Sequence, residues 1–162
     1  MATIDELVEK LLTCFSYRKN EFDKKRKELT SVHFEKWAKD FEKDLLNKNG
    51  IIKIDRGLSL TDSFSQNLTV LDVTRSTIYK HVLFFETKAK GRCITFEFNY
   101  KGSYKNIDVS VPYALFLDVS DIKKADMLKR GDQVNVTGEV TIKKVADSIL
   151  IDFSPNTKFE KA

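Results

Sequence analysis

The chain has 162 residues, of which 41% are hydrophobic and 32% charged, and a formal net charge of +4. This length fits one ordinary domain, or a domain with a helical extension. The six glycines and two prolines exclude collagen-like and proline-rich chains, and no apolar run approaches the roughly 18 residues that cross a bilayer. Cys14 and Cys93 lie far apart, so they predict neither a zinc site nor a disulfide framework. With no signal-peptide pattern at the start, we expect a cytoplasmic protein without a membrane span or a cofactor.

The first 50 residues predict helices. Thr3 followed by Glu6 is a capping box, in which each side chain satisfies a free amide of the first turn. Two apolar stripes recur at helical spacing, formed by Ile4, Leu7, Val8, Leu11, Leu12 and Phe15, and by Phe34, Trp37, Ala38, Phe41 and Leu45. Thr30 or Ser31 begins the second stripe and Asn49-Gly50 ends it. We expect residues 1–50 to form a helical N-terminal extension of two or three helices.

After Gly50 the apolar period changes to two, which predicts a strand-rich domain over residues 51–162. The expected strands are 51–54, 68–73, 78–87, 92–100, 106–111, 133–143 and 148–153. Turns are expected at 88–91 (Lys-Ala-Lys-Gly), at 101–104 (Lys-Gly-Ser-Tyr) and at 145–147. A short helix over 121–130 is expected to begin at Ser120 or Asp121 and to be closed by Gly131.

The order of these elements, with a helix between the third and fourth strands of the body, resembles the oligonucleotide/oligosaccharide-binding (OB) fold. Cys93–Phe98 and Ile107–Pro112 are similar to the second and third OB strands. Leu128–Val140 is similar to the L-x-x-G-D-x-V-x-V-x-G-x-V pattern of anticodon-binding-like OB domains. The resemblance implies an α+β fold: a five-stranded Greek-key OB-type β-barrel after the helical region. Residues 68–73 and 78–87 remain alternative first barrel strands.

Positive charge and aromatic rings gather in the middle of the chain. Residues 76–105 hold six basic side chains against Glu86 and Glu97, and seven of the 18 aromatic residues. In OB domains the first and last hairpins flank the ligand groove, and basic turns there would hold a nucleic-acid backbone. Tyr100, Tyr104 and whichever of Phe84 and Phe85 points outward would stack bases. The candidate nucleic-acid-binding residues are Lys88, Lys90, Arg92, Tyr100, Lys101, Tyr104, Lys105, Lys143 and Lys144. The expected function is non-enzymatic binding of single-stranded DNA or RNA.

Two alternatives stay open. Strand alternation places Ile94, Phe96 and Phe98 inward and several acids outward: Glu97, Asp108, Glu139 and Asp152. Those acids favour a protein-interaction or accessory module, which would dock a partner or form a homodimer through residues 1–50. The second alternative is a metal-dependent nuclease, because Asp72 with Glu86-Thr87-Lys88 resembles the D…(D/E)-x-K signature of restriction-type nucleases. We expect neither catalytic nor metal-binding residues, because no other catalytic motif is present and the two histidines have no partners at metal-site spacing.

Overall fold

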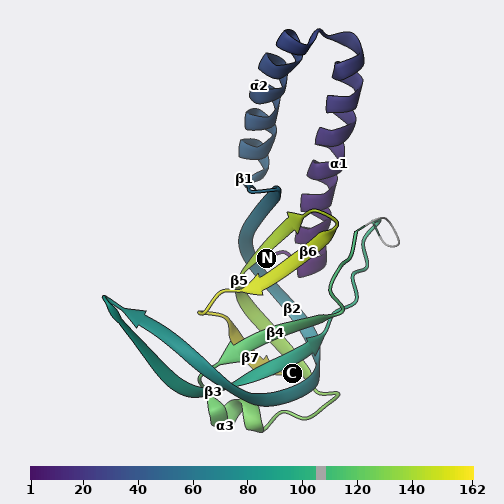
Figure 1. Ribbon diagram of the computed structural model, residues 1–162. Coiled ribbons are helices and arrows are strands. Elements are labelled where there is room, and N and C mark those ends of the chain that lie inside the picture. The colour runs from purple at the N-terminus through teal and green to yellow at the C-terminus, as the bar shows by residue number, and fades with distance from the viewer. Residues whose placement is uncertain (105–108) are drawn as a thin grey trace.

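A computed structural model describes residues 1–104 and 109–162, and it has an α+β architecture (Figure 1). Two helices come first, α1 (Ile4–Glu28) and α2 (Ser31–Asn49). Seven strands and a short helix follow: β1 (Ile51–Ile54), β2 (Gly57–Val82), β3 (Phe85–Glu97), β4 (Ala114–Val119), α3 (Ile122–Asp126), β5 (Gln133–Val145), β6 (Ser148–Phe153) and β7 (Lys158–Lys161). No helix in the described part of the chain is both long and apolar enough to span a membrane.

The two helices form a hairpin that projects from the sheet (Figure 1). The Thr3 half of the expected capping box is confirmed, since the Thr3 side chain accepts a hydrogen bond from the backbone N–H of Glu6 at 3.2 Å. The Glu6 carboxylate instead accepts from the Thr3 hydroxyl at 3.3 Å. Gly50 ends α2 in the left-handed conformation, with φ 67°, as the sequence indicates. The outer part of the hairpin is held by an aromatic cluster in which Trp37 stacks on Phe41 and meets Phe22 edge-on.

The strands form one antiparallel sheet in the order β4-β3-β2-β5-β6, with β1 beside β2 and β7 beside β5, and this sheet is not closed. The long strand β2 organises it: residues 57–69 pair with β5, and residues 69–82 pair with β3. Strand β5 changes partner in a similar way at Gly138, from β7 to β6. Gly138 has φ 150°, and a Cβ there would lie 3.0 Å from the Cα of Thr157, so glycine fits at the point where β5 changes partner.

The sheet and the start of α1 share one hydrophobic core. Ile4, Val8 and Leu11 are fully buried in the same cluster as the sheet residues. The expected inward positions Ile94, Phe96 and Phe98 are confirmed, because all three are buried. On β5 the alternate residues Val134, Val136, Val140 and Ile142 are buried as well. The N-terminal half of α1 is therefore a structural part of the sheet domain. Its C-terminal half and most of α2 extend away, and the end of α2 returns to the same core through Leu46.

The expected strands 68–73 and 78–87 are wrong as separate elements. Residues 68–73 and 78–82 belong to the single strand β2, and residues 85–87 begin β3. A register shift between Val70 and Asp72 interrupts the alternation and splits one strand into two apolar patterns. The turn expected at 88–91 is also wrong. The chain reverses at Leu83-Phe84, so Lys88 and Lys90 lie in the middle of β3.

The strand expected over 106–111 is not formed by Val109–Val111, where only Ser110 makes an isolated bridge, to Ser148. Residues 105–108, which include Lys105, Ile107 and Asp108, lie outside the described residues. The third body strand is instead β4, whose Leu115, Leu117 and Val119 are buried at alternate positions. The helix expected over 121–130 is shorter: α3 covers Ile122–Asp126, begins with the cap at Asp121, and is followed by a turn to Gly131.

Candidate functional site

Beyond the body of the sheet, β2 and β3 continue as a long two-stranded arm, residues 75–92, which reaches far from the core (Figure 1). Every residue from Tyr79 to Lys90 is exposed. The arm holds five of the basic side chains and one acidic side chain, a balance equal to the +4 of the whole chain, so all other residues together carry equal numbers of each. The excess positive charge of the protein therefore lies on the arm.

The strand register divides the arm into two faces, because residues directly opposite each other in an antiparallel pair point the same way. One face, here called the basic face, carries the pairs Arg75–Arg92, Thr77–Lys90, Tyr79–Lys88 and His81–Glu86. The Lys88 ammonium lies 5.6 Å from the centre of the Tyr79 ring, which confirms that these two side chains share a face. The opposite face carries Ile78–Ala89, Lys80–Thr87 and Val82–Phe85 and is mostly apolar.

Three of the sequence-predicted residues, Lys88, Lys90 and Arg92, are thus brought together on the basic face. Sequence reasoning missed Arg75 and Tyr79 as their neighbours. The sequence does contain a pattern that could have identified them: Arg75 and Tyr79 lie an even number of positions apart along β2, as do Lys88, Lys90 and Arg92 along β3. That pattern places all five on one face only when the turn is placed at Leu83-Phe84. Cations recur on β3 at every second residue, about 7 Å apart along the strand.

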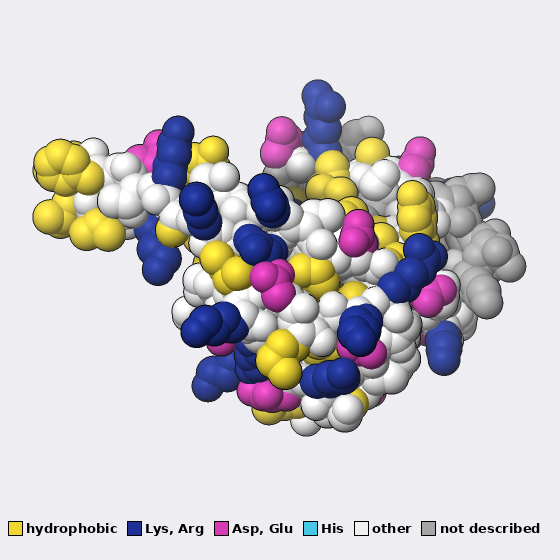
Figure 2. All heavy atoms as spheres, turned by 90° about the horizontal axis from the view of Figure 1, so that it is seen from below, with side chains coloured by type: hydrophobic (Ala, Val, Ile, Leu, Met, Phe, Trp, Pro, Cys, Tyr) yellow, Lys and Arg dark blue, Asp and Glu magenta, His cyan; other side chains and the backbone are white. Residues whose placement is uncertain are grey.

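The arm ends in four consecutive exposed apolar residues, Val82, Leu83, Phe84 and Phe85, here called the arm tip. Figure 2 shows hydrophobic side chains gathered at the end of this projection, with basic side chains along it. Leu83 is 89% exposed and has φ 57°, a conformation that side chains other than glycine, asparagine and aspartate rarely adopt. The turn therefore carries apolar side chains in place of the residues that would form it most easily.

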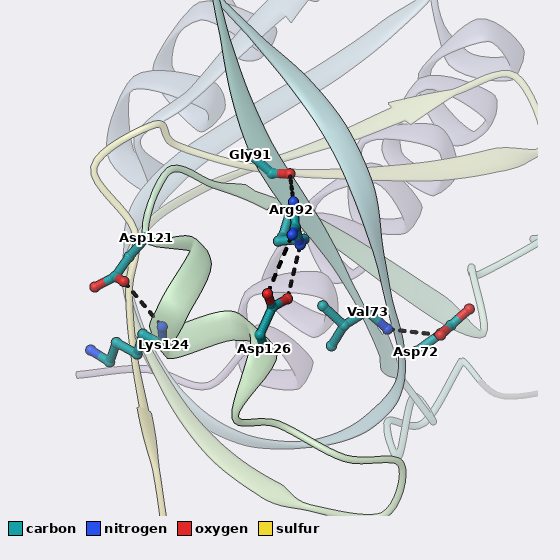
Figure 3. Close-up of polar contacts among 7 residues, drawn as sticks. All are labelled: Asp72, Val73, Gly91, Arg92, Asp121, Lys124 and Asp126. Carbon is teal, nitrogen blue, oxygen red and sulfur yellow. Dashed lines mark hydrogen bonds and ion pairs between the residues drawn. The ribbon is translucent and has the colours of Figure 1, made fainter.

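Arg92 fixes the base of the arm to α3. Its guanidinium group donates to both carboxylate oxygens of Asp126, at 2.8 and 3.3 Å (Figure 3). Asp121 accepts the backbone N–H of Lys124 and thereby begins α3 in the right place for this pair. Ser76 adds a second tie, since its hydroxyl donates to Asp118 of β4 at 2.9 Å. Arg92 is consequently a positioning residue that orients the arm.

A groove of about 790 Å³ lies beside the base of the arm. The exposed aromatic residues Tyr79 and Phe116 line it, together with the segment 152–160. Three lysines and four carboxylates share its lining: Lys80, Lys124, Lys158, Asp118, Asp121, Asp152 and Glu160. Because the four carboxylates outnumber the three lysines, and Lys124 is itself bound to Glu160 at 2.6 Å, the groove has no excess positive charge. The groove therefore exposes aromatic side chains, whereas the positive charge lies on the arm.

The remaining sequence-predicted residues lie elsewhere. Lys144 is only 4% exposed: its ammonium donates to the carbonyl of Ala146 and lies 4.4 Å from the centre of the Phe15 ring. Burial lowers the pKa of Lys144. Lys143 is half-buried on β5 beside the last hairpin, which turns at Ala146-Asp147 as expected. Lys144 is thus part of the packing of α1 on the sheet and presents no charge to a ligand.

Tyr100 is also interior, being 7% exposed, and its hydroxyl donates to Glu9 of α1. Burial raises the pKa of Tyr100, and the Glu9 carboxylate raises it further. Tyr104 packs against the core, and the backbone N–H of Lys101 donates to Asp5 at 3.0 Å. The 100–104 segment therefore fastens α1 to the sheet, far from the basic face. Tyr100 cannot stack a base in this arrangement.

The residues of the nuclease signature are not assembled. Asp72 pairs in register with Thr95 and its carboxylate accepts the backbone N–H of Val73 (Figure 3), whereas Glu86 pairs with His81 near the arm tip. Among the described residues, no group of three or more histidine, cysteine or carboxylate side chains is close enough to hold a metal ion. Burial raises the pKa of the Cys14 and Cys93 thiols, which keeps both protonated at neutral pH.

Comparison with known proteins gives no relative from which a function can be transferred. No protein-family model matches the chain. Neither the curated proteins nor the solved structures give a match to it. The features of the chain that bear on its function are consequently the arm, the groove and the charges described above.

Proposed function

We propose that this protein is an OB-type, non-enzymatic binder of single-stranded nucleic acid. The observation that carries the proposal is the basic face of the arm, where the net charge of the chain is concentrated beside an exposed tyrosine. A positively charged surface that follows a backbone, with aromatic rings to stack bases, is the general design of single-strand binding sites. Tyr79 supplies a ring on the basic face, and Phe116 supplies a second ring in the groove beside the base of the arm.

The strand arrangement supports the OB part of the proposal. In an OB barrel the third strand neighbours the second, the first strand lies between the second and the fourth, and the fifth follows the fourth. The order β4-β3-β2-β5-β6 corresponds to this sequence of neighbours, with α3 between the third and fourth members. The parallel bridge between Ser110 and Ser148 joins the two outer strand regions, where a barrel would close. The arm then corresponds to the first OB hairpin.

The test is fluorescence anisotropy with labelled single-stranded DNA, single-stranded RNA and duplex DNA at low and at physiological salt. The test variant Arg75→Ala/Lys88→Ala/Lys90→Ala removes three cations from the basic face and leaves the Arg92–Asp126 pair intact. Losing three phosphate contacts should reduce the slope of log K against log salt by about 2 for a single strand and weaken binding to all sequences alike.

The matched control is Lys24→Ala/Lys27→Ala/Lys39→Ala, which removes three exposed lysines from α1 and α2 and lowers the net charge equally. It should bind like the unchanged protein. Equal losses in both variants would mean that net charge alone matters and would remove the site assignment. Absence of binding by the unchanged protein, even at low salt, would reject nucleic-acid binding altogether.

A second candidate function is a protein-interaction module. It is favoured by the helical hairpin, where Phe34, Trp37 and Phe41 remain only half-buried on a segment that extends from the sheet (Figure 1). Exposed Glu97, Glu139 and Asp152 give the sheet surface the acidic side chains expected of this alternative. If nucleic acid does not bind, a light-scattering mass that rises with concentration would support homodimerisation, whereas a constant monomer mass would reject it.

A further inference from the structure

The basic face accounts for phosphate contacts but leaves the arm tip unused. Leu83 and Phe84 form the turn, and Val82 and Phe85 form the last pair of the ladder. All four are exposed, Phe84 completely and Phe85 by 72%. Exposed apolar residues scattered singly need no explanation, but four consecutive ones at the end of a projection mark a contact surface.

The strained backbone at Leu83 is an independent observation. Glycine in place of Leu83, the first residue of this two-residue turn, would relieve the positive φ without changing the length of the arm. The sequence instead places bulky apolar side chains where they cost backbone energy and gain no packing. A requirement for those side chains at the tip explains both their exposure and the strain.

The charge pattern indicates what the tip meets. On the basic face, Arg75, Lys88 and Lys90 are distributed from the base of the arm toward its end. A flat anionic surface that met the arm end-on would reach only the cations nearest the tip. A linear polyanion lying along the arm would reach all of them, and its stacked bases would offer apolar faces to the tip.

We propose that the arm tip is a wedge that stacks on the last base pair of a duplex, while the adjoining single strand lies along the basic face. This inference rests on the proposed function and specifies its substrate class as a junction between paired and unpaired nucleic acid. Two features suit the tip to this role. A two-stranded arm is narrow, with strands about 5 Å apart, and apolar side chains are the groups that proteins insert between base steps.

The wedge variant is Leu83→Gly/Phe84→Asn. It removes the two turn side chains, keeps every cation of the basic face and supplies glycine at the one turn residue with positive φ, so the arm is retained. The probe is duplex DNA with a single-stranded tail carrying 2-aminopurine at the last base pair. The comparison probes are the free single strand and a blunt duplex. Phe84→Ser serves as a second, milder variant.

The unchanged protein should bind the tailed duplex about ten-fold more tightly than the free strand and change the 2-aminopurine fluorescence. The wedge variant should lose both effects while keeping the salt dependence of single-strand binding. The matched control Val32→Asn/Tyr113→Ser removes two exposed apolar side chains remote from the arm and should behave like the unchanged protein.

Three results would overturn the wedge. Salt-dependent single-strand binding with equal affinity for the tailed duplex, unaffected by the wedge substitutions, would reject the wedge and leave the proposed function standing. No binding to any nucleic acid at low salt would reject both. Binding to phosphatidylserine vesicles that the wedge variant loses, without any junction preference, would assign the tip to a membrane surface instead.

Discussion

At the scale of single residues, three side chains fasten α1 to the sheet. The Glu9 carboxylate accepts hydrogen bonds from Tyr100, from the Ser103 hydroxyl and from the Ser103 backbone N–H at 3.2 Å. Burial raises the pKa of Glu9, but the bonds from Ser103 and Tyr100 outweigh it and bring the pKa below its ordinary value. A carboxylate with a lowered pKa in the folded protein stabilises the fold above its unfolded pKa, and this stabilisation is lost as the pH falls through the folded pKa.

We therefore predict that Glu9→Gln lowers the melting temperature by a few degrees at pH 7, since a charged acceptor contributes more than a neutral one. The difference from the unchanged protein should shrink below pH 4.5, the ordinary value for glutamate, as Glu9 itself becomes protonated. Thermal melts followed by circular dichroism from pH 3 to pH 7 measure this. Glu35→Gln on the exposed side of α2 is the control. A difference that does not change with pH would contradict the assigned role of the charge.

Residue chemistry also explains which parts of the site the sequence could predict. The inward positions of β3 and β5 followed from alternation, because each has an unbroken apolar parity such as that of Ile94, Phe96 and Phe98. Lysines, by contrast, gave a misleading turn signal at 88–91, because exposed strands and turns select the same polar residues. The roles of Tyr100 and Lys144 could not be predicted, because their partners Glu9 and Phe15 lie far away in sequence.

At the scale of elements, one irregular strand accounts for most of the errors in the predicted fold. Strand β2 runs for 26 residues, far longer than a typical strand, and its amino-acid composition gives no sign of this length. Its bulge at Val70–Asp72 reverses the apolar parity, and its turn at Leu83-Phe84 consists of residues that usually occupy strands. Both features are set by tertiary pairing, to β5 before the bulge and to β3 after it.

The bend in β5 gives a prediction at the same scale. Gly138→Ala should destabilise the protein by about 1–3 kcal/mol, because alanine disfavours a φ of 150° and its Cβ would press against Thr157. Urea unfolding measures the loss. Thr137→Ala, next to the bend on a half-buried position, provides the comparison. If alanine at position 138 is no more harmful than at 137, Gly138 is not needed for the change of partner from β7 to β6.

At the scale of the whole molecule, α1 and the sheet form a single cooperative unit. The helical residues 1–50 and the strand-rich residues 51–162 contribute to the same core, since Leu11 is as deeply buried as Phe96 in one cluster. Leu11→Ala should therefore cost about 2–5 kcal/mol. Unfolding followed by Trp37 fluorescence, which reports α2, and by amide hydrogen exchange of β5, which reports the sheet, should give the same midpoint along a denaturant series. Separate midpoints would mean that the helices unfold on their own.

The position of α1 also has a consequence for how the protein is made. This helix leaves the ribosome before any strand, yet its apolar face packs on β2 and β5. The hydrogen-bond donors to Glu9, Tyr100 and Ser103, are synthesised later still. Until those later segments have been synthesised, Ile4, Leu7 and Leu11 have nothing to cover them. Distant contacts of this kind delay folding and leave nascent chains open to aggregation. We expect the polypeptide to need most of its length before it becomes resistant to protease.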